Sequence, residues 1–527
     1  MKKQKAVQGS VGPSGRASLK LEALEPRLLL SGNVVASIVS GSLVVTGDSL
    51  GNSIVVNQSG LAANQVRVFS GDGTTTINGG AVPVVLTGFS KNTVFSMLGG
   101  NDTVKLDSVA VPGSVVFDGG TGSDSLTIDP SSIGGSIAVK EEGTHIAFSL
   151  QDTQVTGSIK LTNSFGGSST DIVSSTVHGG VQVRNTSGQD SLDVQQSTVS
   201  GGVKSTSGSG DTSTTFQSSS LGGAIQVKNM DGFDSFLLED GTVGGTIKIS
   251  NGAGGSSTTI DPSTVFGSVQ VLNGAGADQF TLDGSTVSGS LTVANGNGTS
   301  ELTLDSSTVQ GSLKALNLLG AQKFSLGSST VHGSVALGNL GGGSDTKIKD
   351  NSTIDGSFAL ANPAGFANLL MEDSSINGSV KVLNGDGGSS LTLDPSRIGG
   401  ALIIATGAGV DTINLDGLTV TGATVMSTGA GKDSVTVKGT SVFQSPFVLD
   451  TGLGNDTASL DASTFNSSLI VLMGPGDDTL SVGSDEPITA NGKAIFDGGL
   501  DTDSIDILTN GNTFVVPPVI VNFETET

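Results

Sequence analysis

The chain has 527 residues, of which 80 are glycine and none is cysteine, tryptophan or tyrosine. It carries 48 acidic against 24 basic residues, which gives a formal net charge of −24 at pH 7. This balance argues against a nucleic-acid partner, because phosphate binding needs clustered lysine and arginine. The lack of cysteine excludes disulfides and cysteine-ligated metals, and no apolar run is long enough to predict a transmembrane segment.

Residues 1–32 differ from the rest of the chain, because they hold six bases and only two acids. A basic start followed by the short apolar run Leu28-Leu29-Leu30 predicts a targeting or processing segment. The run Leu24-Glu25-Pro26-Arg27-Leu28-Leu29-Leu30 closely resembles the LEPR-XLL motif. That motif marks the N-terminus of large, repeat-rich bacterial proteins thought to be exported, so the resemblance implies an extracellular or cell-surface location.

Residues 33–98 read as strands that follow no regular period, for example Ser42–Thr46 and Ser53–Asn57. A repeat array must cover its open ends, because an unpaired strand edge invites association. We therefore expect residues 33–98 to form an irregular β cap at the N-terminal end.

Residues 99–483 repeat with a period of 22 residues. The column that contains Asp278 can be followed from Asp102 to Asp478 through 18 positions, and 15 of its 17 steps equal 22 while two equal 23. A fixed period of this length indicates a solenoid or an array of repeats. A propeller is the alternative, but one blade needs about 40 residues or more.

Apolar residues alternate within each repeat, as in Val269 and Val271 and again in Phe280 and Leu282. Alternation indicates strands, and regularly spaced Gly, Asn, Asp and Ser residues indicate turns between them. We therefore predict an all-β fold, a parallel β-helix (β-solenoid) of about 18 coils with 22 residues per coil. Residues 484–527 leave the register and include Pro517 and Pro518, so we expect a C-terminal cap there.

A turn of the form Gly-x-Gly-x-Asp recurs in the repeats, and residues 119–127 match the calcium-binding pattern G-G-x-G-x-D-x-U-x. These turns resemble the RTX family of calcium-binding repeats, although that family repeats every nine residues or so. The resemblance implies calcium bound by aspartate and turn carbonyls. The predicted metal ligands are Asp124, Asp278, Asp411, Asp433, Asp456, Asp477 and Asp478. The alternative is a purely structural glycine turn.

A second acidic column follows five residues later, as in Asp261, Asp283 and Asp305. We expect these carboxylates to cap turns by accepting backbone N–H groups. Pairs of carboxylates could instead act as acid and base, as in glycoside hydrolases. Nothing in the sequence distinguishes one coil from its neighbours, so we predict no catalytic residue.

These observations predict a non-enzymatic extracellular or cell-surface β-solenoid with a structural or adhesive role, stiffened by calcium. Its expected partners are a surface polysaccharide or matrix proteins. The alternative is a carbohydrate-active β-helix enzyme of the polysaccharide lyase or hydrolase kind. Coils of nearly constant length leave little room for the loops that build a catalytic groove, and aromatic platforms of Tyr or Trp are absent from the sequence.

Overall fold

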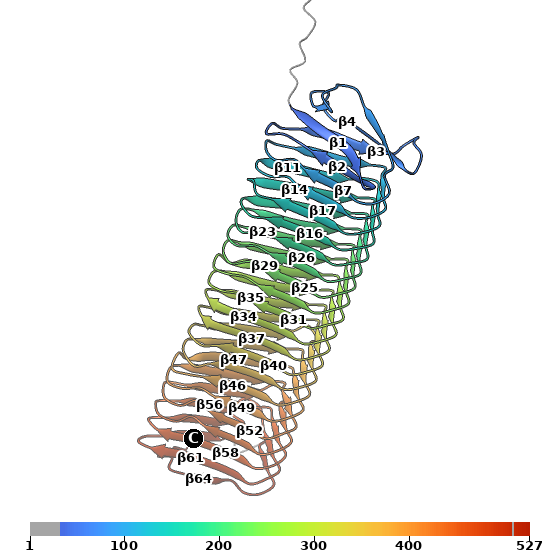
Figure 1. Ribbon diagram of the computed structural model, residues 1–527. Coiled ribbons are helices and arrows are strands. Elements are labelled where there is room, and N and C mark those ends of the chain that lie inside the picture. The colour runs from blue at the N-terminus through green and yellow to red at the C-terminus, as the bar shows by residue number, and fades with distance from the viewer. Residues whose placement is uncertain (1–31, 508–510, 527) are drawn as a thin grey trace, which may run out of the picture.

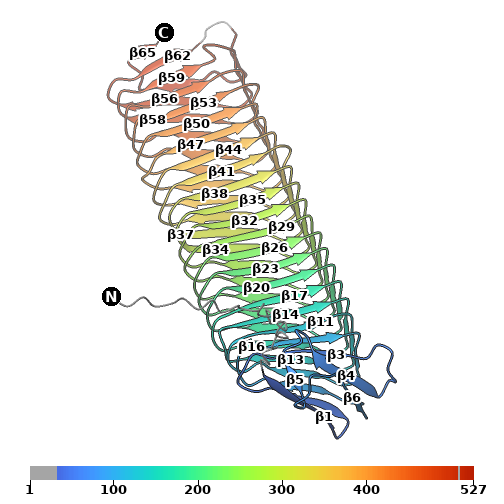
Figure 2. The same ribbon diagram turned by 90° about the horizontal axis from the view of Figure 1, so that it is seen from above.

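The chain is an all-β parallel β-solenoid of about 19 turns with about 22 residues per turn. The computed structural model describes residues 32–507 and 511–526, and within these residues it contains no helix. The predicted fold class is therefore confirmed. Figures 1 and 2 show the coils stacked along one axis into a rod. The LEPR-XLL-like segment lies outside the described residues.

Each coil contributes one strand to each of three parallel sheets. In a typical coil these strands are β31 (Val269–Leu272) in sheet 1, β32 (Asp278–Asp283) in sheet 2 and β33 (Thr286–Val287) in sheet 3. β31 pairs in parallel with β28 (Ile247–Ser250) and β34 (Leu291–Asn297) of the neighbouring coils. We call the connections within a coil the first turn (sheet 1 to sheet 2), the second turn (sheet 2 to sheet 3) and the third turn (sheet 3 to the next coil).

The interior of the rod is filled by the apolar residues that alternate along these strands. Val269, Val271, Phe280 and Leu282 are at most 1% exposed, as the alternation predicts. Each lies over its equivalent in the next coil, for example Val271 over Val293. Stacked aliphatic residues about 4.8 Å apart explain why a narrow interior needs so few aromatic residues.

Glycine is required in the first turn because the coils approach each other closely there. Gly454 and Gly476 have φ angles of 138° and 144°, a region that residues with a side chain rarely adopt. A Cβ atom on Gly476 would lie 1.7 Å from the carbonyl oxygen of Gly454 in the preceding coil. The repeated Gly-x-Gly pattern is therefore explained by backbone stacking.

The N-terminal end of the rod is covered by antiparallel strands (Figure 1). Antiparallel pairs join β1 (Asn33–Val39) to β2 (Ser42–Thr46), β3 (Ser53–Asn57) to β4 (Gln65–Ser70), and β4 to β6 (Val84–Thr87). β2 pairs in parallel with β7 (Thr93–Ser96), β3 pairs in parallel with β8 (Thr103–Asp107), and β5 (Thr76–Ile77) pairs in parallel with β1. The irregular strands thus connect directly to the first coils of sheets 1 and 2.

The C-terminal residues continue the coil pattern. β60 (Thr489–Ala490), β61 (Ala494–Leu500) and β62 (Ser504–Ile507) pair in parallel with the coil before them. β63 (Thr513–Phe514), β64 (Val519–Val521) and β65 (Thr525–Glu526) pair in parallel with these three. The described residues 484–507 and 511–526 therefore stack as further coils.

Candidate functional site

Six of the seven aspartates predicted as calcium ligands lie at the start of sheet 2, with their side chains inside the rod. Their exposed fractions range from 0% to 6%. These six residues are Asp124, Asp278, Asp411, Asp433, Asp456 and Asp478. Asp477 is exposed in the first turn. The structure thus places six predicted ligands in an interior column, which we call the carboxylate column.

Near the C-terminus the carboxylate column is unbroken over five coils. The backbone N–H of Asp411 donates to Oδ1 of Asp433 at 2.9 Å, and Asp433 donates to Asp456 at 2.8 Å. Asp456 donates in the same way to Asp478 at 2.7 Å, and Asp478 to Asp503 at 2.9 Å. In all five residues Oδ2 is buried and has no hydrogen-bond partner. Each carboxylate therefore caps the coil before it with one oxygen and leaves the other unsatisfied.

Burial is the main cause of the raised pKa values of the aspartates in this column. Burial raises the pKa of Asp478 to about 7, together with the carboxylates of Asp456 and Asp503 and against the N–H bond from Asp456. Burial also raises the pKa values of Asp411 and Asp433. Two ionised carboxylates about 4.8 Å apart repel by roughly 3 kcal/mol at an effective dielectric constant of about 20. The column therefore needs protons or a cation near neutral pH.

At the N-terminal end of the column, the buried Glu141, which ends a strand of sheet 1, lies beside Asp124. The N–H of Asp102 donates to Oδ1 of Asp124 at 2.7 Å, and burial raises the pKa of Asp102 to about 7. Glu141 is 0% exposed, and burial together with the adjoining Asp124 raises its pKa strongly. A Cβ atom on Gly119 would lie 2.2 Å from Glu141 Oε2 and 2.3 Å from Asp124 Oδ2, so this glycine leaves space for both oxygens. Burial and the neighbouring Asp124 therefore favour the protonated form of Glu141, because both raise its pKa.

In the middle coils the column alternates between aspartate and neutral residues from Asp190 to Ser300, and beyond Ser300 it is neutral as far as Ser389. Asp278 lies between Ser256 and Ser300, and the Ser256 hydroxyl donates to Asp278 Oδ1 at 2.8 Å. Burial raises the pKa of Asp278 to about 6. Ser344, rather than Asp345, occupies the buried place opposite Gln322. The sequence period assigned Asp345 to this place, one residue too far, because the extra residue of this coil lies in the second turn and not before β41 (Ser344–Lys349).

An interior asparagine ladder was missed by the sequence reasoning. It lies at the end of sheet 1, across the first turn from the carboxylate column. Asn251 donates to Asn273 Oδ1 at 2.8 Å, and Asn273 donates to Asn295 Oδ1 at 2.7 Å. Asn317 donates to Asn339 Oδ1 at 3.2 Å and to the first-turn carbonyl of Gly320 at 3.0 Å. A side-chain amide can do both, because it has two N–H donors and one acceptor oxygen.

Threonine replaces asparagine in this ladder near the C-terminus. The hydroxyl of Thr406 donates to the carbonyl of Thr428 at 2.9 Å, and Thr428 donates to the carbonyl of Thr451 at 2.6 Å. These threonines lie in the coils of Asp411, Asp433 and Asp456, whereas asparagine accompanies aspartate in other coils, as in Asn273 and Asp278. Within the described residues, buried aspartates occupy successive coils of the column only near its two ends.

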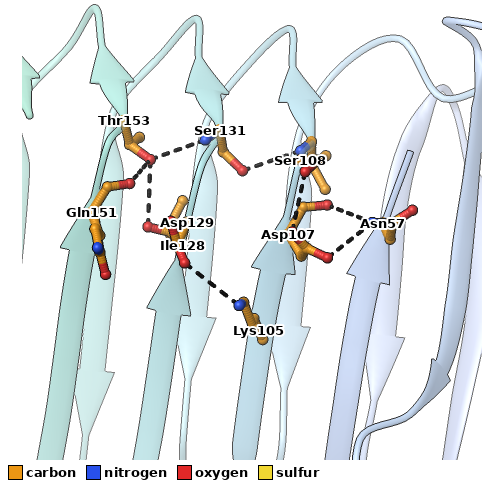
Figure 3. Close-up of polar contacts among 10 residues, drawn as sticks. Asn57, Lys105, Asp107, Ser108, Ile128, Asp129, Ser131, Gln151 and Thr153 are labelled. Carbon is orange, nitrogen blue, oxygen red and sulfur yellow. Dashed lines mark hydrogen bonds and ion pairs between the residues drawn. The ribbon is translucent and has the colours of Figure 1, made fainter. Parts of the chain in front are cut away.

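The second turn is held by hydroxyl groups and not by the second acidic column (Figure 3). The N–H of Ser131 donates to Oγ1 of Thr153 at 3.1 Å, and that hydroxyl donates to the carbonyl of Gln151 at 2.7 Å. Asp129 instead contacts Lys105 at 3.5 Å, and Asp107 accepts from the Asn57 amide at 3.0 Å. In these coils the second turn is therefore capped by Ser131 and Thr153, which stand two residues after the acidic column. The expected capping by the acidic residues themselves is not seen at Asp107 and Asp129.

The arrangement as a whole places a column of carboxyl groups inside the rod. Among residues 32–507 and 511–526, no group of three or more His, Asp or Glu side chains is arranged to hold a metal ion. No helix of the described chain is long and apolar enough to span a membrane. Comparison with known proteins finds no matching family, no matching curated protein and no matching solved structure.

Proposed function

We propose that the protein is a non-enzymatic extracellular or cell-surface rod with a structural or adhesive role. The observation that carries this proposal is the stack of coils from β8 (Thr103–Asp107) to β65 (Thr525–Glu526), in which the described residues contain no inserted domain. About 19 turns spaced by about 4.8 Å give a rod of roughly 90 Å. A stiff rod of this kind suits a protein that spans distance at a surface. The LEPR-XLL-like run supports an exported location.

The acidic residues support this proposal over the enzymatic alternative. The aspartates of the carboxylate column face the interior, where a polysaccharide cannot reach them. The second acidic column forms one row along the outside, with one carboxylate per coil in Glu239, Asp261, Asp283 and Asp305. Acid and base catalysis on a glycosidic bond needs two carboxylates on opposite sides of that bond. A single row along one strand end does not provide this.

Calcium is proposed as the cation that neutralises the C-terminal part of the carboxylate column. The supporting observation is the set of buried Oδ2 atoms of Asp411, Asp433, Asp456, Asp478 and Asp503, which accept no hydrogen bond. Ca²⁺ takes six to eight oxygen ligands, so two such oxygens would need first-turn carbonyls or water to complete the set. Asp477 at the surface of the first turn would attract the ion to this end. A cation bound only by the folded state would raise the melting temperature.

Two measurements test the role and the shape together. Antibody labelling and protease treatment of intact producing cells should reach the protein, and deletion of its gene should weaken attachment or matrix cohesion. Excision of residues 245–288, which are two whole coils, should shorten the purified rod by about 10 Å without unfolding it. A protein protected inside the cell, or one that cleaves polysaccharide, would contradict the proposal.

The calcium assignment is tested by melting in chelator and in millimolar calcium. We expect calcium to raise the melting temperature of the natural protein and not that of the double variant Asp433→Ala, Asp456→Ala. The matched control is Asp386→Ala, Asp450→Ala, which removes the same charge from exposed positions. If calcium shifts the melting temperature equally in the natural protein and in both variants, the carboxylate column is not the calcium site. The proposal of a structural rod would be unaffected.

A further inference from the structure

A row of basic residues lies on the outer face of sheet 1 in six successive coils. We call it the basic strip, and its residues are Lys140, Lys160, Arg184, Lys204, Lys228 and Lys248. They belong to β13 (Ile137–Glu141), β16 (Ile159–Asn163), β19 (Val181–Arg184), β22 (Val203–Thr206), β25 (Ile225–Lys228) and β28 (Ile247–Ser250). All six side chains are exposed. The strip holds six of the 24 bases of a chain whose net charge is −24.

The bases alternate between the two outward positions of each strand. In one position the stacked residues are Lys160, Gln182, Lys204, Gln226 and Lys248. In the other they are Lys140, Thr162, Arg184, Thr206, Lys228 and Ser250. Each coil therefore contributes one positive charge, and bases in the same position lie two coils, or about 10 Å, apart. The zigzag reduces repulsion and spreads the positive charge evenly along the axis.

The strip is left unneutralised by its own chain. Lys140 forms ion pairs with Asp118 and Glu142, but the other five bases form none within the described residues. No acidic residue occupies an outward position of the strands from β16 to β28. Five unpaired bases on a flat sheet face, in a protein with twice as many acids as bases, form a charged surface that lacks a partner.

A hollow runs along the strip parallel to the rod. Its volume is about 640 Å³, and it extends over four coils from Lys160 to Gln226. One side is formed by alternating lysine and glutamine side chains, and the other by the third turns, where Gly180, Gly202 and Ala224 have little or no side chain. Small residues repeated at the same place leave an open hollow that follows the rod axis over four coils. This shape fits a linear polymer lying along the axis better than a compact molecule.

We propose that the basic strip binds a linear polysaccharide that carries carboxylate groups, aligned with the rod axis. This inference rests on the proposed adhesive function and names the class of its ligand. Lysine and arginine would pair with the carboxylates, while Gln182, Gln226 and Thr206 would hydrogen-bond to sugar hydroxyls. An extended sugar chain advances per ring by a distance similar to the rise of one coil, so contacts can repeat from coil to coil.

The same features disfavour a nucleic acid as the ligand. A nucleic-acid strand carries one charge per about 3.4 Å, which is denser than one base per coil. No aromatic side chain stands at an outward position of β13 to β28, where single-stranded nucleic acids need stacking platforms.

The test compares the full chain with a triple variant, Lys160→Gln, Lys204→Gln, Lys248→Gln. Glutamine already occupies the same stack at Gln182 and Gln226, so the variant should fold. Binding of oligogalacturonate, a linear uronic-acid chain, should weaken about tenfold or more in the variant, and raising the salt concentration should weaken it in the natural protein.

The control variant Lys314→Gln, Lys323→Gln, Lys381→Gln loses the same charge outside the strip, and it should bind oligogalacturonate like the natural protein. A neutral cello-oligosaccharide should bind at least tenfold more weakly. Equal losses in the strip and control variants, equal binding of the neutral chain, or tighter binding of single-stranded polythymidine would each overturn the proposal.

Two further outcomes separate this inference from the proposed function. In the first, the natural protein self-associates but binds no polysaccharide, and the strip variant no longer self-associates. This result would assign the strip to a second copy of the chain and overturn the inference. In the second, the natural protein does not bind oligogalacturonate, and cells that carry the strip variant still attach. This result would also overturn the inference, but it would leave the proposed adhesive rod in place. Binding that is lost in the strip variant alone supports it, even if the cells show no adhesion defect.

Discussion

Replacing Asp278 by asparagine should stabilise the protein at alkaline pH and have little effect at acidic pH. Asp278 is isolated in the carboxylate column, because Ser256 and Ser300 occupy the neighbouring coils. Burial raises its pKa from the ordinary value of 3.8 to about 6. Asparagine has nearly the same shape, keeps an oxygen that accepts the Ser256 hydroxyl at 2.8 Å, and carries no charge.

The sign and size of the effect follow from proton linkage. The folded state binds the Asp278 proton more tightly than the unfolded state, so the stability of the natural protein falls as pH rises from about 4 to about 6. One pKa unit corresponds to about 1.4 kcal/mol, and the shift of about two units gives roughly 3 kcal/mol. The variant lacks this loss. The free energy of unfolding of the variant should equal that of the natural protein below about pH 4. Above about pH 7 it should be larger by up to roughly 3 kcal/mol.

Urea unfolding in the presence of chelator, at pH values from 4 to 8, measures the difference directly. The matched control is Asp283→Asn, which lies on the same strand β32 but faces outward, so that water solvates both forms. Chelator excludes stabilisation by a cation. A variant that is less stable than the natural protein at pH 8, or a difference that does not change with pH, would refute the conclusion that Asp278 is buried as an ionisable group.

Three further substitutions test the interior. Val271→Asp should cost about 3 kcal/mol or more, because it buries a charge in an apolar stack, whereas Gln270→Asp on the outer face should cost under about 1 kcal/mol; similar urea midpoints would show that the two faces are assigned wrongly. Asn317→Ala removes two hydrogen bonds and leaves the Gly320 carbonyl without its amide donor, so we expect a loss of about 1–3 kcal/mol in urea unfolding and faster hydrogen exchange in that coil. Glu141→Gln should leave stability at pH 7 within about 1 kcal/mol of the natural protein, because the natural residue holds a proton there; a large loss at pH 7 in thermal melting would mean that Glu141 is ionised.

The fold could be predicted because two periods in the sequence agree. The 22-residue period gives the coil, and the two-residue alternation gives the strand faces, so Val271 and Phe280 were placed inside before the structure was known. The residue that breaks the constant period is harder to place. In the coil of Ser344 the extra residue lies in the second turn, where Asp350 and Asn351 both adopt positive φ, so counting from one coil to the next moved Asp345 into the wrong column.

The interior polar columns could have been found from the same alternation. Asp278 stands two residues before the inward Phe280, and Asn273 stands two residues after the inward Val271, so both share the parity of buried residues. The Gly-x-Gly-x-Asp pattern alone predicts a turn at Asp278, and burying a charged or polar group is costly without partners. The stacking of coils supplies those partners at the same spacing in every repeat. A column of identical polar residues is therefore compatible with burial where a single one is not.

The alternation also makes the inside and the outside of each coil independent. An inward residue must match its equivalents in the coils above and below, and this constrains the interior to ladders of Val, Leu, Ser, Asn or Asp. An outward residue meets only solvent and its neighbours on the same face, so charge can accumulate there without disturbing the stack. Coils of β16 to β28 use this freedom to carry bases on sheet 1, whereas the coils of Asp411 to Asp503 place their charge inside. The rod would then respond to solutes in two separate regions. Anionic polymers would bind the surface charge of the basic strip, whereas protons or cations would bind the buried carboxylate column.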